Sequence, residues 1–521
     1  MNEYIAYCGL DCEACEARLA TVNNDNELRQ RVAREWSELN GVEITAEMIN
    51  WARAEKMERI VPLKELWGYP KISADTGQRS KIKGMKSKKK KHTAIRRIVI
   101  LYIFAVLVLT GAVFSHFGGF GTGGSADPEE FATYAGQISD ITIPENTRII
   151  ALGEATHGNR EFQQLKLDVF QIMVEQVGVR AFALEGDYGG CEAVNRYIHG
   201  GEGTAKEAAA AIGFAIYRTG EMENLISWMR SYNVTAADGD DIRFYGFDMQ
   251  QTEYNYQFLL EELKSLGHDT AELEKLRDGE DWSALYDREE RILVFTELRQ
   301  DLSERVSASD TDQAIETAVH LTDILLQNQA MEKAYEENFA DANGIRDQYM
   351  ADNTMWILEQ EERRGNDRIF ITGHNGHMEQ SGTYVGGENK VMGNLLTDRI
   401  GRDAYFAIGT DFYKTTCNFP TSSGKRVNRT FYSRDPLAKA SRKNGYDVSW
   451  LDFSVIPADG GLAEMVNGYI FMGNLGENPM DGLNGIVYRI LPYAYRVWQV
   501  PSELYDGMIF VTEAHPISVN N

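Results

Sequence analysis

The chain has 521 residues, of which 43% are hydrophobic and 25% are charged, an ordinary composition for folded domains. Its formal net charge is -25, although residues 81–97 hold nine Lys and Arg and no acid. The remainder is therefore strongly acidic, which excludes nucleic acid as a partner of the main domain, because an acidic surface repels phosphate backbones. Five cysteines are too few for a disulfide scaffold.

Residues 1–84 are predicted to be a cytoplasmic fragment that contains a C-x3-C-x2-C cluster made by Cys8, Cys12 and Cys15. Such thiolates could hold a metal, but a closed zinc site needs a fourth ligand, and no second Cys or His pair follows before residue 98. The first fifty or so residues resemble the beginning of a small cysteine-rich bacterial domain of unknown function. Because Met85 opens a sequence typical of signal-anchored bacterial proteins, we interpret the fragment as an appended piece.

A basic run over residues 85–97 precedes an uncharged apolar segment over residues 98–117. Twenty helical residues span about 30 Å, the thickness of a hydrocarbon core, so the segment is predicted to be a transmembrane helix. By the positive-inside rule, the basic run stays in the cytoplasm and the C-terminal domain is extracytoplasmic, on the cell membrane. A Gly-rich linker over residues 118–130 follows.

Residues 131–521 are predicted to form one α/β domain with a mainly parallel central sheet flanked by helices. Apolar runs of strand length alternate there with longer segments of helical period. The expected strands lie within residues 147–158, 179–188, 241–250 and 367–377, the expected helices over residues 160–178 and 189–200, and further strands after residue 403, one of them over residues 482–490.

A large helical insertion is predicted between the third and fourth strands, over residues ~252–365, because almost all of it has helical period. Ligands of open α/β sheets lie beyond the carboxyl ends of the strands. We therefore expect the insertion to close a cleft at that edge.

Ionisable residues follow these strands: Glu154 and His157 after the first, Glu185 and Asp187 after the second, Asp248 after the third, and His374 and His377 after the fourth. If the strands are parallel neighbours, these side chains converge at one edge of the sheet. An imidazole that titrates near neutral pH, oriented by carboxylates, is suited to acid–base catalysis.

Five segments are similar, in order and spacing, to signatures of the erythromycin esterase family: GEATHGNREF, FALEGDYGGCEAVNRYIHG, RDQYMADNTMWILE, FITGHNGHME and MGNLLTDRIGRDAYFAIGTDF. The similarity covers residues ~126–521. It implies a hydrolase in which His157 is the general base that activates water, with Glu154, Glu185, His374 and His377 as the other site residues. Lys166 stands where some esterases have an arginine, which leaves the role of that position open.

The sequence agrees with an activated-water mechanism, because it contains no G-x-S-x-G nucleophile elbow. We expect His157, held by Glu154 or Glu185, to remove a proton from water as the water attacks an ester or lactone carbonyl. His374, His377 or Arg346 would stabilise the oxyanion or protonate the leaving alcohol. Asp248 is expected to bind a loop amide.

Several alternatives stay open. The resemblance implies that no cofactor is required, but two glutamates and three histidines could also bind a divalent metal. The expected partner is a small-molecule ester or macrolide-like substrate, so that the protein would inactivate a macrolide antibiotic. The alternatives are a haem- or metal-binding surface protein and a hydrolase of a cell-envelope substrate. A bond between Cys191 and Cys417 is also left open.

Overall fold

The structure, a computed structural model, describes part of the chain. The described residues are 26–40, 126–271, 273–274, 288–308, 313–384, 389–433, 435–490 and 495–520. Two compact units divide the chain, Met1–Ile100 and Leu101–Asn521. The described part of the first unit is helix α2 (Asn26–Asn40), and the predicted cysteine cluster lies outside it.

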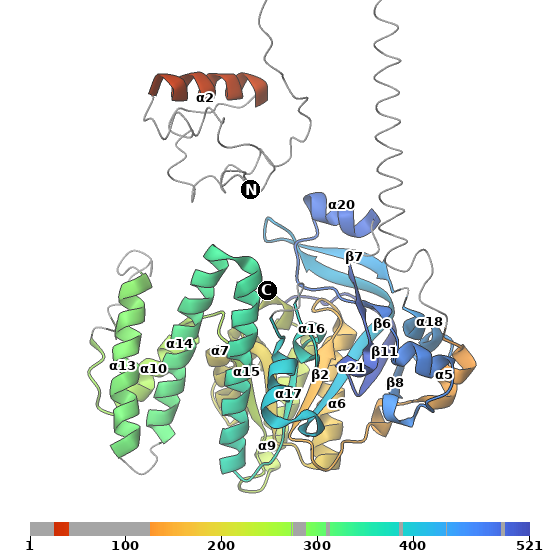
Figure 1. The fold of residues 1–521 in the computed structure, drawn as a ribbon. Helices are drawn as coiled ribbons and strands as arrows, with labels where there is room; N and C mark the ends of the chain where they lie inside the picture. The colour runs from red at the N-terminus through yellow and green to blue at the C-terminus, as the bar shows by residue number, and fades with distance from the viewer. Residues whose placement is uncertain are drawn as a thin grey trace, which may run out of the picture. The chain divides into compact units, whose positions relative to one another are not determined.

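A nine-stranded sheet forms the centre of the second unit (Figure 1). Along the sheet the order is β1 (Ala135–Gly136), β8 (Val448–Asp452), β11 (Gly507–Ala514), β6 (Tyr405–Pro420), β2 (Ile149–Glu154), β5 (Ile369–His374), β3 (Ala181–Asp187) and β4 (Arg243–Asp248), with β7 (Arg426–Tyr432) paired to β6. The six strands from β11 to β4 pair in parallel, whereas β1, β8 and β7 pair antiparallel. The prediction of a mainly parallel sheet therefore holds at the centre and fails at one end.

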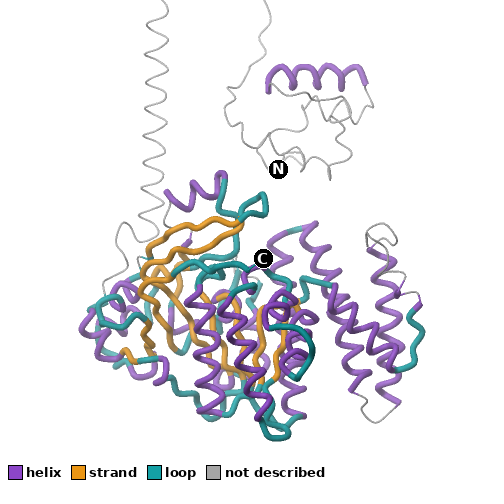
Figure 2. The backbone as a smooth tube through the Cα atoms, turned by 180° about the vertical axis from the view of Figure 1, so that it is seen from behind, coloured by secondary structure: helices purple, strands orange, loops and turns teal. Residues whose placement is uncertain are grey.

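Helices cover both faces of the sheet (Figure 2), and alternate side chains of the central strands point into these two layers. Ile149 and Ala151 of β2 pack into one cluster with α15 (Phe339–Arg363) and α17 (Met392–Ile400), whereas Ile150 and Leu152 pack into the other with α6 (Arg160–Val177) and α9 (Gly220–Thr235). Because successive side chains of a strand point to opposite faces, a continuous apolar run is needed where both faces are covered. All six residues of β2 are accordingly buried.

Helix α6 shows how the sequence sets its own boundaries. Its apolar residues recur with helical period, and Phe162, Leu165, Val169 and Met173 are buried against the sheet. Gly178 ends the helix in the left-handed conformation with φ 71°, which costs glycine little because it has no Cβ. The predicted helix over residues 160–178 is thus present.

The segment between β4 and β5 is helical where it is described. It contains α10 (Glu253–Ser265), α13 (Arg288–Ala308), α14 (Gln313–Glu337) and α15. Helices α10, α13 and α14 form a group beside α15, at the left of Figure 1.

The other helices and short strands are α5 (Pro128–Tyr134), α7 (Tyr188–Ile198), α8 (Ala205–Ala211), α16 (Asn375–Met378), α18 (Pro436–Ser441), α19 (Gly461–Val466), α20 (Gly482–Ile490), α21 (Pro501–Leu504), and a hairpin of β9 (Ile470–Gly473) and β10 (Arg496–Gln499). The strand predicted over residues 482–490 was wrong, since α20 occupies that segment. Its apolar residues at 483, 486, 487 and 490 have the spacing of one helix face.

Strand β4 is an outer strand of the sheet, and side chains cover part of its unpaired edge. The Phe244 amide donates to Asn195 Oδ1 of α7 over 3.2 Å, and Asn353 Nδ2 of α15 donates to the Phe247 carbonyl over 3.1 Å. The first of these bonds satisfies an edge group that a further strand would otherwise use. At the opposite end, β1 has only two residues.

The prediction of a membrane anchor needs correction. Residues 98–117 lie outside the described residues, and none of the helices described in residues 26–40 and 126–520 is long and apolar enough to cross a bilayer. The two longest, α14 and α15, have 25 residues each, but acidic and basic side chains recur along both. The transmembrane helix in the predicted fold class and the extracytoplasmic location therefore find no support.

Candidate functional site

The ionisable residues that follow the central strands converge, because β2, β5, β3 and β4 are consecutive parallel neighbours. Glu154 is in register with His374, and Asp187 with Asp248. A cavity of about 540 Å³ opens at this edge. Its walls include His157, Glu185, Asp248, Arg346, His374 and His377. The expected convergence is confirmed.

His157 is held by Glu154, which resolves one of the open alternatives. Its Nδ1 lies 2.8 Å from Glu154 Oε1, whereas the second oxygen, Oε2, is bonded to Lys166 Nζ. Burial alone would lower the pKa of His157, but the hydrogen bond and charge of Glu154 outweigh it, and the net shift is upward. Burial would raise the pKa of Glu154, yet Lys166 and His157 together lower it. Glu154 is therefore a carboxylate that fixes the His157 ring with Nδ1 protonated.

Lys166 thus has a definite role in the structure. It lies on α6, and its side chain is fully buried beside Glu154. An unpaired buried carboxylate would be costly, so the ammonium compensates its charge.

Glu185 lies on the other side of the cavity and is bonded to Arg346 of the helical insertion. Arg346 donates to Glu185 Oε1 over 2.8 Å and to Asp248 through two nitrogens, over 2.6 and 3.2 Å. The His374 amide donates to Glu185 Oε2 over 2.7 Å. Burial opposes ionisation of Glu185, but His377 and Arg346 hold its pKa well below the usual value. Asp248 also accepts from the Met249 amide and the Gln250 side chain, so it binds loop amides as predicted and an arginine as well.

His377 lies between two carboxylates, one of which sequence reasoning missed. Its Nδ1 is 2.8 Å from Asp347 Oδ1, and its Nε2 is 3.4 Å from Glu185 Oε1. Although burial lowers the pKa of His377, the charges of Asp347 and Glu185 raise it overall. Asp347 adjoins Arg346 in the RDQYM segment, and that adjacency on one helix was the available signal. His377 Nε2 also lies 3.3 Å from Arg346 Nη1, so the ring contacts a guanidinium as well as the two carboxylates.

His374 differs from both other histidines. Burial, together with the neighbouring His157 and His377, lowers the pKa of His374 to about 3. Its Nδ1 accepts a hydrogen bond from the Gly376 amide over 3.3 Å, so the neutral ring carries its proton on Nε2. Among the described residues, Nε2 has no hydrogen-bond partner. The His374 and His157 ring centroids are 5.0 Å apart, which places a neutral N–H donor beside the candidate base.

A glycine before His374 makes room for Glu185. A Cβ at Gly373 would lie 2.7 Å from Glu185 Oε2 and 2.8 Å from Glu185 Cβ, so a side chain there must displace the carboxylate. We expect Gly373→Ala to lower the free energy of unfolding by about 1–3 kcal/mol through overpacking, and to lower activity with it. Urea unfolding measures the first effect. Gly220→Ala, where no atom lies within 4 Å of the added Cβ, is the matched control, and an equal effect of the two changes would contradict the explanation.

Four buried carboxylates of the site are matched by cations of the protein. Glu154 pairs with Lys166 and His157, Glu185 and Asp248 with Arg346, and Asp347 with His377. In the part of the chain that the structure describes, no group of three or more His, Cys, Asp or Glu has the arrangement of a metal site.

Asp187, Cys191 and Cys417, also noted in the sequence, do not line the cavity. Asp187 caps α7 by accepting from the Gly190 amide and also binds Asn255, and burial raises its pKa to about 8. Cys191 and Cys417 are both buried and free, so the bond that the sequence left open is not formed.

The fold and this cluster define an α/β domain with buried histidines, carboxylates and an arginine around a cavity at the carboxyl edge of its parallel strands. The sequence model of the erythromycin esterase family matches residues 174–514. The chain therefore belongs to the erythromycin esterase family, and it is a hydrolase of that family.

Two relatives are similar in sequence. Erythromycin esterase type II of Escherichia coli is 26% identical over 361 residues, which cover 60% of this chain and 82% of that protein. The putative hydrolase YbfO of Bacillus subtilis is 22% identical over 296 residues, covering 50% of this chain and 64% of the relative. The predicted resemblance to the family is thereby confirmed, whereas the resemblance predicted for residues 1–84 finds no support.

Solved structures share the fold. A protein from Bacillus cereus superposes with a TM-score of 0.61 at 20% identity, over 76% of this chain and 98% of its own. A succinoglycan biosynthesis protein gives 0.60 at 19% identity, over 75% and 98% of the two chains. The erythromycin esterase EreC in its open conformation gives 0.52 at 16% identity, over 72% and 93%.

Proposed function

We propose that this protein is a carboxylic ester hydrolase that opens an ester or lactone of a macrolide-like small molecule, with water activated by His157. The observation that carries the proposal is the placement of three histidines with different partners in one cavity. His157 is fixed by a carboxylate, His374 is neutral, and His377 lies between two carboxylates. The name of the E. coli relative, an erythromycin esterase, supports the substrate class.

In the proposed reaction, His157 Nε2 takes a proton from water as the water oxygen forms a bond to the carbonyl carbon. Glu154 holds Nδ1 and stabilises the imidazolium that results. The carbonyl π electrons move to its oxygen, and the Nε2–H of His374 donates to that oxyanion. When the tetrahedral intermediate collapses, the bond to the alkoxy oxygen breaks, and the His157 imidazolium returns its proton to the leaving alcohol.

Arg346 and His377 complete the proposed site. Arg346 and His377 hold Glu185, and Glu185 in turn accepts from the His374 amide. Arg346 and His377 also line the cavity, where positive charge favours an oxyanion. We assign them to binding and electrostatic stabilisation, and Glu154 and Glu185 to orienting the histidines.

The proposal requires no metal, since each carboxylate of the cluster already faces a cation of the protein. The experiment that tests it is hydrolysis of a panel of macrolides and simple esters by the full chain, with and without chelator. We expect hydrolysis of at least one lactone or ester, unchanged by chelator. Chelator-sensitive activity would contradict the metal-free mechanism, and a panel without any hydrolysis, or a bound haem absorption band, would contradict the esterase function.

The pH dependence follows from the His157–Glu154 pair. Because the pKa of His157 is raised and only its neutral form accepts a proton, kcat/KM should fall as the pH decreases through that raised value. In Glu154→Gln the carboxylate that raises the pKa is gone, so the acid limb of the profile should move to lower pH while the rate decreases. A pH–rate profile of both proteins measures this, and a limb that moves to higher pH would contradict it.

A further inference from the structure

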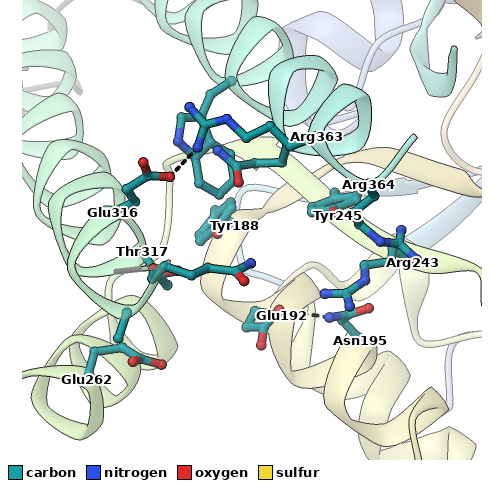
Figure 3. A pocket seen from close by; sticks show the side chains of 14 residues that line it. Tyr188, Glu192, Asn195, Arg243, Tyr245, Glu262, Glu316, Thr317, Arg363 and Arg364 are labelled. Atoms are coloured by element: carbon teal, nitrogen blue, oxygen red, sulfur yellow. Dashed lines mark hydrogen bonds and ion pairs between the residues drawn. The ribbon is translucent and has the colours of Figure 1, made fainter. Parts of the chain in front are cut away.

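A second cavity lies away from the site, between α7, β4, α14 and α15. Its volume is about 560 Å³, within the usual range of small-molecule pockets, and it shares no lining residue with the cavity that contains His157. In Figure 3, Glu316 and Thr317 of α14 lie across from Arg243 and Tyr245 of β4, with Tyr188 of α7 between them. Nothing in the proposed hydrolytic mechanism uses this cavity.

Aromatic rings form one wall of it. The Trp356 and Tyr188 ring centroids are 5.8 Å apart at an interplanar angle of 79°, and His320 stacks on Trp356 at 3.8 Å. A smaller adjoining cavity of about 210 Å³ is lined by His320 and also by Trp356, Gln360 and other residues of the larger one. His320 is only 5% exposed, and among the described residues its Nε2 has no hydrogen-bond partner. A buried, unsatisfied nitrogen beside a cavity is a group that a ligand can satisfy.

The other walls of the cavity carry as many acidic as basic side chains. Three glutamates, Glu192, Glu262 and Glu316, accompany three arginines, Arg243, Arg363 and Arg364. Arg363 pairs with Glu316 across the cavity. Each of these six side chains is paired with an opposite charge, either within the lining or on Arg196, Asp241 or Glu361, so the lining offers neither an anion nor a cation an unpaired partner.

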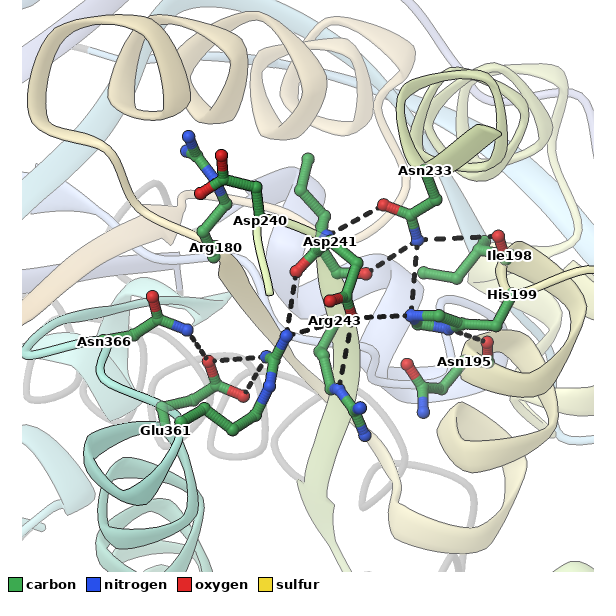
Figure 4. A network of polar contacts seen from close by, with 12 residues as sticks. Arg180, Asn195, Ile198, His199, Asn233, Asp240, Asp241, Arg243, Glu361 and Asn366 are labelled. Atoms are coloured by element: carbon green, nitrogen blue, oxygen red, sulfur yellow. Dashed lines mark hydrogen bonds and ion pairs between the residues drawn. The ribbon is translucent and has the colours of Figure 1, made fainter. Parts of the chain in front are cut away.

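A network of hydrogen bonds and ion pairs that includes Arg243, Asp241 and Glu361 holds part of the arginine side of the cavity (Figure 4). Arg364 donates to both oxygens of the buried Glu361, over 2.8 and 2.9 Å, and lies 2.9 Å from Asp241 Oδ2. Asn366 donates to Glu361 over 2.7 Å, and Arg243 Nε is 3.5 Å from the same Asp241 oxygen. A wall that is fixed before a ligand arrives loses little conformational entropy on binding.

We infer that this cavity is a binding site for a neutral, polyhydroxylated ligand, that is, a saccharide. Hydroxyl groups both donate and accept, so they match a lining that mixes carboxylates, guanidinium groups and the Gln360 amide. The C–H faces of a sugar ring pack against an aromatic ring such as that of Trp356, which lines both cavities. The balanced charge selects a neutral sugar over a uronic acid or an amino sugar.

Saturation-transfer NMR on the full chain tests the inference, with maltose and cellobiose as neutral probes and glucuronate and glucosamine as charged ones. We expect saturation of the neutral disaccharides in preference to both charged sugars. Trp356→Ala should weaken binding about tenfold, because it removes an aromatic contact. Gln360→Leu, which keeps the side-chain size, should weaken binding too. It tests the same cavity if Trp356→Ala does not fold.

Two controls separate this site from others. Trp498→Ala, at an exposed tryptophan on β10, and His157→Asn, in the hydrolytic cavity, should both leave saturation unchanged. A preference for either charged sugar, no saturation of any neutral one, or full binding by both Trp356→Ala and Gln360→Leu would overturn the inference. Since His157→Asn reports on hydrolysis alone, failure of the saccharide site and failure of the proposed esterase function give different results.

Discussion

Replacement of His157 by Asn is expected to lower kcat/KM for ester hydrolysis by about 10²–10⁴-fold, the usual contribution of a positioned general base. Asn is of similar size and can still bond to Glu154, but it cannot take a proton from water. The side chain is 9% exposed, and Glu154 keeps its pairing with Lys166, so the fold should persist. Steady-state kinetics on the best ester of the panel, with a thermal unfolding curve of each protein, measure both effects.

The matched control is His268→Asn, at a histidine of the helical insertion that lies 3.3 Å from Asp301 and does not line the cavity. Its kcat/KM should equal that of the unchanged protein. An equal rate for His157→Asn and His268→Asn would exclude His157 as the base.

Lys166→Met is expected to reduce the free energy of unfolding by about 3–5 kcal/mol, because it leaves a buried carboxylate without its cation. Lys166 is 0% exposed and Glu154 is 2% exposed, so water cannot replace the lost charge. Methionine fills most of the same volume, which limits any cavity. Urea unfolding followed by circular dichroism gives the difference in free energy.

Two further variants test whether the uncompensated charge of Glu154 causes the loss of stability. Lys206→Met changes an exposed lysine and should alter stability by less than about 0.5 kcal/mol. The double variant Lys166→Met/Glu154→Gln removes both charges and should recover part of the loss, since a neutral amide is cheaper to bury than a lone carboxylate. If the double variant is as unstable as the sum of the two single ones, the uncompensated charge is not the reason.

Local patterns in the sequence were sufficient to predict the strands and helices that form the centre of the domain. Residues 147–158 and 367–377 hold uninterrupted apolar runs because β2 and β5 are covered on both faces. The segment over 482–490 was assigned wrongly, because a short apolar run with β-branched residues fits a strand and a helix equally well. The membrane anchor was inferred from an uncharged apolar run that follows a basic one, and no described helix supports it.

One rule was sufficient to predict part of the site. Side chains that follow parallel neighbouring strands meet at one edge of the sheet. That rule placed His157, Glu185 and His374 together, as the register of β2, β5 and β3 shows. It could not identify Asp347 or the role of Lys166, because both lie on helices and reach the cluster only through tertiary packing. Which carboxylate holds His157 depended on the same packing, and sequence left that choice open.

The protected ends of the sheet bear on self-association. A bare outer strand is a template on which a second chain can add, strand by strand, toward aggregates. Here the side chain of Asn195 occupies the Phe244 amide at the edge of β4, and β1 at the far end offers only two residues. Each end therefore offers a second chain fewer free backbone groups than a bare strand would, which disfavours the growth of one sheet onto another.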